Sequence, residues 1–239
     1  HVLRRRQRQM CIRDRSYELR TPLTSIIGFA EMLDNEYFGS LNDKQSEYIH
    51  NILTSSDRLM VLINDILDLA MTEAGAMALE LNEVSLPDLV SGSIAMNQEA
   101  ARNKGVILRA DVDEDSDVIT GDERRLKQVL YNLISNAIRF TPKDGLIKVS
   151  VYKEDGQTVL QVKDTGIGIH AEEQEEVFER FRKGSNAGQY KSAGLGLSLV
   201  RSFVELHGGE VLLESTVDQG TTVTCLIPNE VKAPQTTDA

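Results

Sequence analysis

Apolar residues in the first third of the chain recur at alternating steps of three and four positions, from about residue 12 to 33 and again from 49 to 70. This spacing is typical of helices that pack along one apolar face. Gly39 and Asn42 predict the turn between them. Because one stripe on each helix cannot close a core, we expect two copies of this helical hairpin to pair as a dimeric four-helix bundle. The first series crosses Pro22 without a change of phase, so we expect a bend there rather than a helix start.

The pattern changes after Gly75 to short apolar runs separated by longer helical stretches. It predicts strands at 78–84, 106–112, 117–120, 146–152, 158–163, 210–215 and 221–227, and helices at 86–103, 122–140, 172–178 and 195–207. Elements in this order indicate an α/β sandwich, in which a mixed sheet carries helices on one face. We therefore expect the hairpin at 16–75, a second domain at 76–230 and a disordered tail at 231–239.

Charge is unevenly distributed along the 239 residues, whose net charge is −11. Residues 1–15 hold six arginines and one aspartate, and we interpret them as a basic leader of non-native origin. The strongly acidic remainder argues against a nucleic-acid partner, because phosphate binding needs the opposite sign. No apolar run is long enough to span a bilayer, so membrane attachment would need upstream segments. Cys11 and Cys225 form no metal-ligand or disulfide pattern, as expected in the cytoplasm.

Two asparagines, Asn132 and Asn136, lie four positions apart in the predicted helix at 122–140, so they project from the same helix face. Asparagine is a poor helix former without apolar surface, so a pair on one face favours a binding role over a solvated surface. Two amide oxygens can complete the shell of a Mg²⁺ ion that also binds phosphate and water. Arg139, one turn later, can reach the phosphates, and Phe140 follows it in the same motif.

Glycine-rich segments follow in the second half of the chain. Asp164, Gly166 and Gly168 come directly after a predicted strand. The carboxylate can accept a hydrogen bond from an adenine amine, and the glycines let the backbone pass close to the base. Alone, this pattern also fits an ordinary turn. Gly194 and Gly196 open the last long helix, whose first N–H groups suit a polyphosphate.

These motifs, with the segment 178–181 between them, resemble in order and spacing the ATP-binding domain of histidine kinases, gyrase-type topoisomerases and Hsp90-type chaperones, the GHKL or Bergerat fold. The resemblance implies that ATP and Mg²⁺ are the cofactors. It also implies a lid over the nucleotide that contains Lys183 and Lys191, with Ser192 where the family often has glycine. The hydrolytic relatives have glutamate where Asn132 stands, which disfavours an ATPase motor.

Residues 16–23 read Ser-Tyr-Glu-Leu-Arg-Thr-Pro-Leu. They resemble the phosphoacceptor box of the two-component sensor histidine kinases, which has histidine in place of Tyr17 and, in the position of Glu18, an acid/base residue. The resemblance extends to about Pro228. A tyrosine hydroxyl has a pKa of about 10 and is a poor nucleophile at neutral pH. Its phosphate ester is also a weaker phosphoryl donor than phosphohistidine, so we expect no ordinary phosphorelay.

The tyrosine is similar to that of the DivL-type histidine-kinase homologues. This likeness implies a homodimeric, cytoplasmic signalling regulator whose partners are a response-regulator receiver domain and a hybrid histidine kinase. Three alternatives stay open: Tyr17 is autophosphorylated, Thr21 orients water to dephosphorylate a bound regulator, or the natural chain has histidine at position 17. We interpret His50, His170 and His207 as surface or capping residues.

Overall fold

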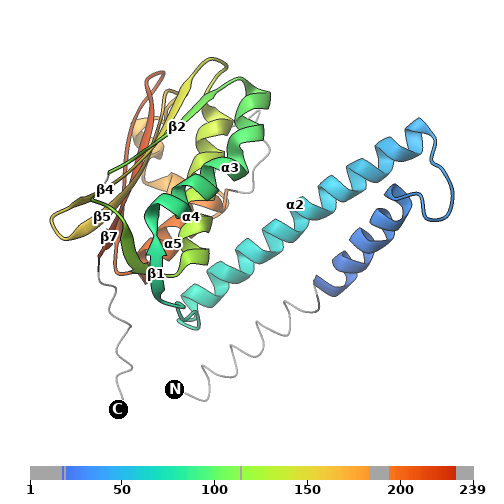
Figure 1. Ribbon diagram of the computed structural model, residues 1–239, viewed down its shortest axis with the longest axis horizontal. Coiled ribbons are helices and arrows are strands. Elements are labelled where there is room, and N and C mark those ends of the chain that lie inside the picture. Colours follow the sequence, from blue (N-terminus) through green and yellow to red (C-terminus); the bar gives the residue numbers. More distant parts are fainter. Residues whose placement is uncertain (1–17, 19, 114, 183–193, 230–239) are drawn as a thin grey trace, which may run out of the picture. The chain divides into compact units, whose positions relative to one another are not determined.

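The computed structural model describes residues 18, 20–113, 115–182 and 194–229 (Figure 1). By its internal contacts the chain divides into two compact units, one ending at Met77 and the other beginning at Ala78. In the described part, no helix is both long and apolar enough to cross a bilayer.

The first unit is a pair of helices joined by a turn. Residues 18 and 20–34 are helical, so Pro22 lies inside a helix and does not begin one. Helix α2 (Asp43–Glu73) begins after Asn42, whose side chain accepts a hydrogen bond from the Gln45 backbone N–H, while the Gln45 side chain accepts one from the Asn42 N–H, both at 2.9 Å. This reciprocal cap satisfies two N–H groups at the helix start. Arg20 Nε donates to Asn64 Oδ1 at 2.9 Å, which ties the two helices together.

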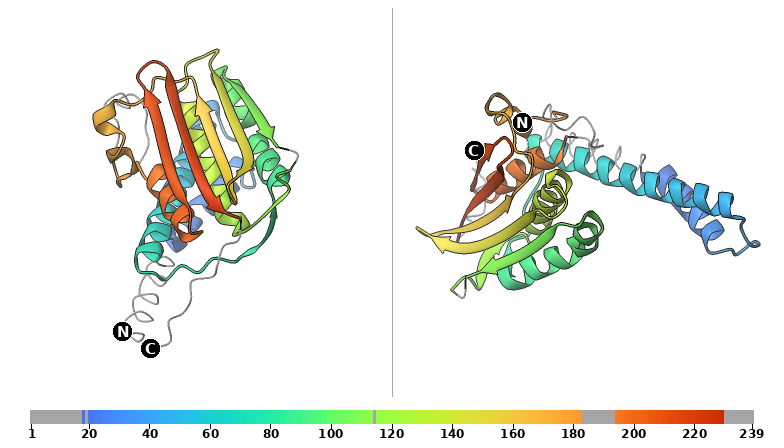
Figure 2. Two further views of the ribbon diagram at one scale, coloured as in Figure 1. Left: turned by 90° about the vertical axis from the view of Figure 1, so that its left-hand side faces the viewer. Right: turned by 90° about the horizontal axis from the view of Figure 1, so that it is seen from above.

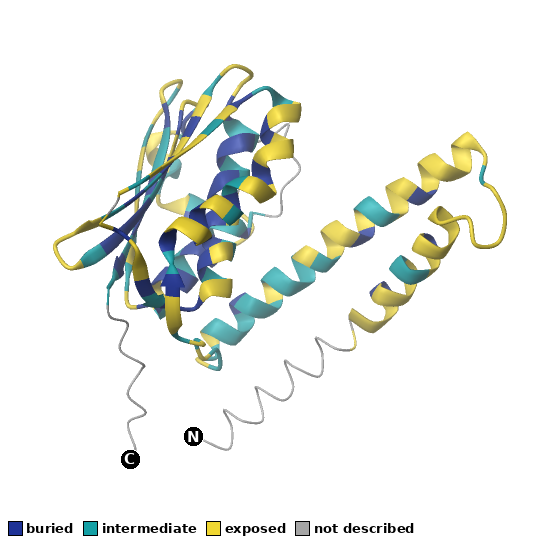
Figure 3. Cartoon of the chain, viewed as in Figure 1, coloured by how far each residue is buried: buried dark blue, intermediate teal, exposed yellow. Residues whose placement is uncertain are grey.

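Most residues of the two predicted series in the hairpin fall into two sets (Figure 3). The residues of one set are buried between the two helices of the same chain. The other set, here called the exposed stripe, leaves 44–49% of each side chain open to solvent. The predicted helical periodicity therefore divides into an inner seam and an outer surface. The inner seam contains Leu23, Ala30, Ile49 and Ser56, and the exposed stripe consists of Ile26, Leu33, Ile52, Leu59 and Ile66.

The second unit is a five-stranded mixed sheet with helices on one face, which confirms the predicted α/β sandwich (Figure 2). The strand order is β2-β4-β5-β7-β6, in which β2 and β4 are parallel and the other neighbours are antiparallel. The strands are β2 (Ile107–Val112), β4 (Leu146–Glu154), β5 (Gln157–Asp164), β6 (Glu210–Thr216) and β7 (Gly220–Pro228), and the covering helices are α3 (Leu86–Lys104), α4 (Glu123–Phe140) and α5 (Gly196–Leu206).

Helix α4 lies between α3 and α5 and carries the apolar face that holds the layers together. Leu126, Leu130 and Ile134 are completely buried, at the four-residue spacing of one helix face. They meet a sheet whose inward residues, among them Ile147 and Leu160, are also fully buried. Burying each such side chain contributes about 1.5–3 kcal/mol, so this face fixes how α4 is rotated against the sheet.

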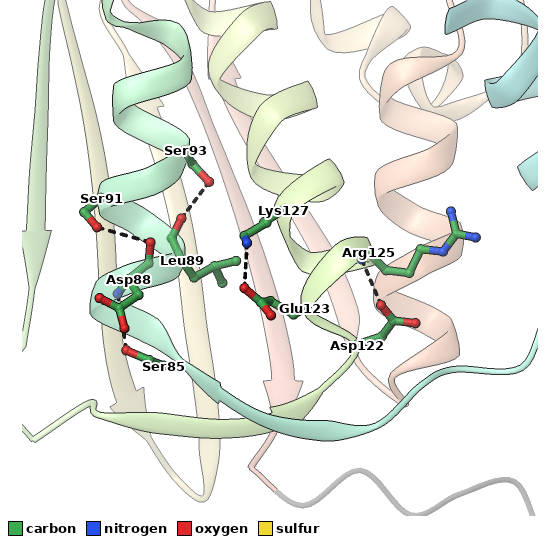
Figure 4. A network of polar contacts seen from close by, with 9 residues as sticks. All are labelled: Ser85, Asp88, Leu89, Ser91, Ser93, Asp122, Glu123, Arg125 and Lys127. Carbon is green, nitrogen blue, oxygen red and sulfur yellow. Dashed lines mark hydrogen bonds and ion pairs between the residues drawn. The ribbon is translucent and has the colours of Figure 1, made fainter.

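Side-chain caps fix where α3 and α4 begin (Figure 4). Ser85 Oγ accepts the Asp88 backbone N–H at 3.3 Å, and Asp122 Oδ1 accepts the Arg125 backbone N–H at 3.1 Å. Each cap supplies an acceptor that the first turn of a helix lacks. Because Asp122 sets the first turn of α4, it also sets the height at which the later turns of α4 lie along the sheet.

Two predicted elements differ in detail. The strand expected at 78–84 begins only at Asn82, and β1 (Asn82–Ser85) pairs with β3 (Val118–Gly121) in a separate two-stranded sheet. The backbone N–H of Glu80 donates to Asp122 Oδ2 at 3.0 Å. A side chain therefore occupies the donor that a neighbouring strand would have used.

The helix expected at 172–178 is replaced by two 3₁₀ turns, Ala171–Glu173 and Glu176–Phe178. Gln174 lies between them, and its side chain donates to the carbonyls of Ile169 and Ser215 at 3.2 and 2.9 Å. These bonds pull the segment toward β6, and a continuous helix would break them.

Candidate nucleotide-binding site

The two asparagines of the predicted magnesium site lie beside the start of α5. Asn132 and Asn136 are half-buried on α4. A Cβ added at Gly196, the first residue of α5, would lie 3.5 Å from Asn136 Nδ2 and 3.7 Å from Asn132 Cγ. The fold therefore brings together the asparagine pair and the glycine turn, which are sixty residues apart in sequence.

Asn132 has a buried side-chain nitrogen, Nδ2, that finds no hydrogen-bond partner among the described residues. An unpaired buried donor costs about 1–3 kcal/mol, so it points to an acceptor that the protein itself does not supply. A terminal amide can donate from its nitrogen to a phosphate oxygen, or turn its oxygen toward a cation. The orphaned nitrogen therefore fits a phosphate oxygen, and the amide oxygens of Asn132 and Asn136 are ligands of the kind that Mg²⁺ binds.

The first turn of α5 has no side-chain cap. Leu195 precedes it, and Ser198 Oγ donates to the Leu195 carbonyl at 2.8 Å instead of accepting a helix N–H. Gly194 has a φ of +71°, and a Cβ there would lie 2.5 Å from the Arg182 carbonyl oxygen, so this turn needs glycine. The N–H groups at the positive end of the helix dipole suit an anion next to the asparagine pair.

Asp164 ends β5 and is nearly buried, with 8% of its surface exposed. Its Oδ1 accepts the backbone N–H groups of Gly166 at 2.7 Å and Thr221 at 3.3 Å. Burial raises the pKa of the Asp164 carboxyl, and the two backbone hydrogen bonds oppose that shift in part. Both of these bonds use Oδ1, so Oδ2 is the oxygen suited to accept an adenine amine.

The loop after Asp164 is fixed to the end of α4. A Cβ at Gly166 would lie 2.7 Å from both Asp164 Oδ1 and the Phe140 carbonyl oxygen. The Ile167 N–H donates to the same Phe140 carbonyl at 3.2 Å. Gly168 has a φ of +67°, and a Cβ there would lie 2.1 Å from the Thr216 carbonyl oxygen. Gly166 thus lets the loop approach the end of α4 closely, and Gly168 lets it approach the end of β6.

Arg139 occupies the last turn of α4, between the asparagine pair and Phe140. It is half-buried, and this burial lowers the pKa of its guanidinium, while the nearby Tyr131 raises it. Because arginine starts from a pKa above 12, it stays charged at neutral pH. The second unit thus carries an orphaned amide and a cation on α4, a buried carboxylate at the end of β5 and an uncapped helix start at α5.

Family comparisons agree with this arrangement. Residues 121–231 match the family of histidine kinase-, DNA gyrase B- and HSP90-like ATPases, and residues 7–75 match the His Kinase A phospho-acceptor domain. The chain belongs to the two-component histidine kinase family. An ATP-binding domain of this family therefore accounts for the second unit.

Several histidine kinases resemble this family member closely. The circadian input-output histidine kinase CikA of Synechococcus elongatus is 44% identical over 219 residues, which cover 90% of this chain and 29% of CikA. The histidine protein kinase DivJ of Caulobacter vibrioides is 38% identical over 214 residues, which cover 89% of this chain and 36% of DivJ. The chain thus spans about a third of the length of these two relatives.

Solved structures of histidine kinases show the same fold. Full-length ShkA, crystallised in complex with AMPPNP, superposes with a TM-score of 0.81 at 30% identity, over 94% of this chain and 46% of ShkA. The Acinetobacter baumannii histidine kinase AdeS superposes with a TM-score of 0.65 at 22% identity, over 90% of this chain and 98% of AdeS. At that identity AdeS supports the fold alone.

The structure brings together only part of the residue set that the sequence indicated for this histidine-kinase homologue. Asn132, Asn136, Arg139, Phe140, Asp164, Gly166, Gly168, Gly194 and Gly196 all lie in the second unit, around the site described above. Tyr17, Lys183 and Lys191 lie outside the described residues. Glu18 and Thr21 belong to the first unit, where both are exposed on the first helix.

The sequence did not predict three contacts that hold the helices of the second unit in place. His207 is the C-cap residue of α5, which confirms the predicted capping position, but its side chain is completely buried and not at the surface. Arg201 of α5 stacks its guanidinium on the ring of Phe178, 4.1 Å from the centroid. Lys104 of α3 donates to carbonyls at the end of α4. Each contact joins segments far apart in sequence, so only the Gly208-Gly209 pair after His207 offered a local signal.

Proposed function

We propose that this chain is a homodimeric signalling module of the histidine kinase family that binds Mg-ATP but does not relay phosphoryl groups through Tyr17. The observation that supports the proposal most strongly is a contrast. The second unit has residues suited to a nucleotide around the orphaned amide of Asn132, whereas tyrosine stands in the acceptor box where the family has histidine. Binding and relay are therefore separable in this chain.

In this proposal each part of the site takes a different part of Mg-ATP. Asn132 and Asn136 hold the Mg²⁺ ion by their amide oxygens, as hard oxygen ligands do. The start of α5 at Gly196, together with Arg139, binds the phosphates, and Asp164 accepts the adenine amine. Phe140 supports the adenine loop through its carbonyl, and Gly166, Gly168 and Gly194 allow the close approaches. Lys183 and Lys191, on the segment between Arg182 and Gly194, add cations for the phosphates.

Tyr17 is chemically unsuited to the relay. A tyrosine hydroxyl, whose ordinary pKa is about 10, must lose its proton to a base before it can attack the γ-phosphate at neutral pH. A phosphotyrosine would also transfer its phosphoryl group to an aspartate far less readily than a phosphohistidine. The chain is thus similar in role to the DivL-type homologues.

The hairpin at residues 16–75 is the proposed interaction unit. The proposed nucleotide-binding domain spans residues 76–230, and we place both in the cytoplasm. The exposed stripe of the hairpin supports dimerisation into a four-helix bundle, because apolar side chains at this spacing seek a matching helix face. A response-regulator receiver domain, and through it a hybrid histidine kinase, are the proposed partners. In this proposal the receiver domain docks at the acceptor box, although Tyr17 replaces the histidine that would carry the phosphoryl group.

Incubation of the full chain with γ-labelled Mg-ATP tests the proposal. We expect no protein-bound label after either acid or alkali treatment. Acid-labile label would show a histidine relay and would overturn the proposal. Acid-stable label that disappears in Tyr17→Phe would establish the alternative function, tyrosine autophosphorylation.

Thr21 supports a second candidate function. It stands four positions after Tyr17 in the sequence and is exposed on the first helix, where it can orient water toward the phosphoaspartate of a bound regulator. Dephosphorylation of a phosphorylated receiver domain by this chain, lost in Thr21→Ala but kept in Ser25→Ala, would establish a phosphatase. Ser25 is the matched control because it carries an exposed hydroxyl one turn further along the same helix.

Nucleotide binding is tested separately. A saturating ligand at one hundred times its Kd stabilises the native state by about 2.7 kcal/mol. Mg-ATP should therefore raise the melting temperature of the wild-type chain, and Asn136→Asp should remove that shift because it places a negative charge beside the phosphates. Absence of a shift in wild type would refute the nucleotide site while leaving the Tyr17 argument intact.

A further inference from the structure

Lys104 connects the end of α3 to the end of α4. Its Nζ donates to the Ile138 carbonyl at 2.7 Å and also to the Arg139 carbonyl. Gly105 fixes the position of Lys104, because it ends α3 with a φ of 72° and its carbonyl accepts the Asp144 N–H at 2.7 Å. This turn holds the last residue of α3 next to the loop that follows α4.

The last four carbonyls of α4 have no partners within the helix, as at any helix C-terminus, yet all of them are satisfied here. The helix's own cap residue serves one, Lys104 serves two, and the loop that follows Asp164 serves the last. A cation at this end also stabilises the helix dipole. The acceptors and donors are Ala137 with Thr141, Ile138 and Arg139 with Lys104, and Phe140 with Ile167.

Lys104 therefore binds the carbonyls of Ile138 and Arg139. In the sequence these two residues lie between Asn136 and Phe140, whose carbonyl holds the adenine loop. Lys104 and Arg139 also interact through their charges. Burial lowers the pKa of the Lys104 ammonium, and the nearby Arg139 lowers it further. An anion relieves the repulsion between two like charges, and the proposed triphosphate site begins at Arg139.

We propose that Lys104 is a positioning residue for nucleotide binding, which holds the Ile138 and Arg139 carbonyls so that the Arg139 guanidinium meets the phosphates of ATP. This inference rests on the proposed function, since it takes the site between α4 and α5 to bind Mg-ATP. Lys104 acts through Arg139 and does not itself need to touch the nucleotide.

Isothermal titration of the full chain with Mg-ATP tests the role of Lys104. Lys104→Met should raise the Kd at least tenfold, and Lys104→Arg should recover most of the affinity, because arginine also carries charged donors that can reach carbonyls. Lys127→Met is the matched control: Lys127 is an exposed lysine at the opposite end of α4, where it pairs with Glu123. This control should bind like wild type.

A double-mutant cycle separates positioning from general stabilisation. In an Arg139→Met background, Lys104→Met should change the Kd less than twofold, because the group that it positions is gone. Equal losses in both backgrounds, or wild-type affinity in Lys104→Met, would overturn the inference. If Lys104→Met does not fold, Lys104→Gln replaces it in the cycle. Failure of wild type to bind Mg-ATP would instead refute the proposed function.

Discussion

The backbone N–H of Asp122 donates a 3.0 Å hydrogen bond to Nε2 of His207, so the start of α4 is bonded to the end of α5. The other ring nitrogen, Nδ1, lies 2.6 Å from the Phe203 carbonyl and donates to it, which fixes the neutral tautomer with the proton on Nδ1. Asp122 in turn binds the Glu80 N–H through its side chain. A single buried imidazole thus locks the two helices whose other portions form the nucleotide site.

This bond predicts a pH-dependent stability. Burial lowers the pKa of His207, while the Phe203 carbonyl and Asp122 oppose the shift. With a folded-state pKa below the ordinary 6.5, His207 contributes its full stability above pH 6.5. That stability is lost as the pH falls from 6.5 toward the folded-state pKa, since only the unfolded chain then takes up the proton, with a slope of up to about 1.4 kcal/mol per pH unit.

Denaturant unfolding between pH 5 and 8 measures this effect. His207→Gln should lower the free energy of unfolding by about 1–3 kcal/mol at pH 7.5 and should flatten its pH dependence below 6.5. His170→Gln is the control, because His170 is exposed in the same unit. Wild type and the two variants have the same carboxylates, so these add the same pH dependence to each. If the free energy of unfolding of His207→Gln falls as steeply below pH 6.5 as that of wild type, His207 is not the source of the effect.

Much of the fold and of the site could be predicted from the sequence, because local patterns encode them. The four-residue spacing of Asn132 and Asn136 places both on one helix face, and Asp164 follows directly on a strand of alternating residues. What the pattern could not predict was set by contacts distant in sequence. Glu80 is not part of a strand, because its backbone N–H donates to the Asp122 carboxylate. The helix predicted at 172–178 is interrupted at Gln174, whose side chain donates to the Ser215 carbonyl.

Asp164 gives a prediction that separates stability from binding. Because burial raises its pKa above 3.8, the carboxyl contributes most stability below that pH and loses it as the pH rises through the folded-state pKa. Asp164→Asn keeps an oxygen for the Gly166 and Thr221 N–H groups and removes the buried charge. We therefore expect the melting temperature at pH 7 to stay equal or rise.

The same substitution should weaken Mg-ATP binding about 10- to 100-fold, because the new NH₂ group would face the adenine amine donor to donor. Titration calorimetry gives the Kd, and thermal unfolding gives the melting temperature. Asp155→Asn, at the exposed turn between β4 and β5, should change neither. Unaltered affinity in Asp164→Asn would rule out Asp164 as the adenine acceptor.

The exposed stripe of the hairpin predicts how the dimer can be dissociated. Leu59 belongs to the stripe with 49% of its surface exposed, and Val61, with 53% exposed, lies about 200° away around the same helix. Leu59→Glu should place a charge in the bundle core and convert the dimer to monomers, whereas Val61→Glu should leave it intact. Light scattering after size-exclusion chromatography measures both masses. Dissociation by both variants, or by neither, would argue against a dimer interface along the stripe.

Replacing Tyr17 by histidine completes the family's acceptor box and tests whether the tyrosine alone prevents relay. In Tyr17→His an imidazole nitrogen can attack the γ-phosphorus, forming an N–P bond while the P–O bond to ADP breaks, with Glu18 placed to take the proton. We expect acid-labile label from γ-labelled Mg-ATP in this variant. Tyr17→Phe should stay unlabelled. The double variant Tyr17→His/Asn136→Asp should also stay unlabelled, because it should not bind Mg-ATP. If Tyr17→His binds Mg-ATP and still takes up no label, the chain has lost more of the kinase machinery than its acceptor.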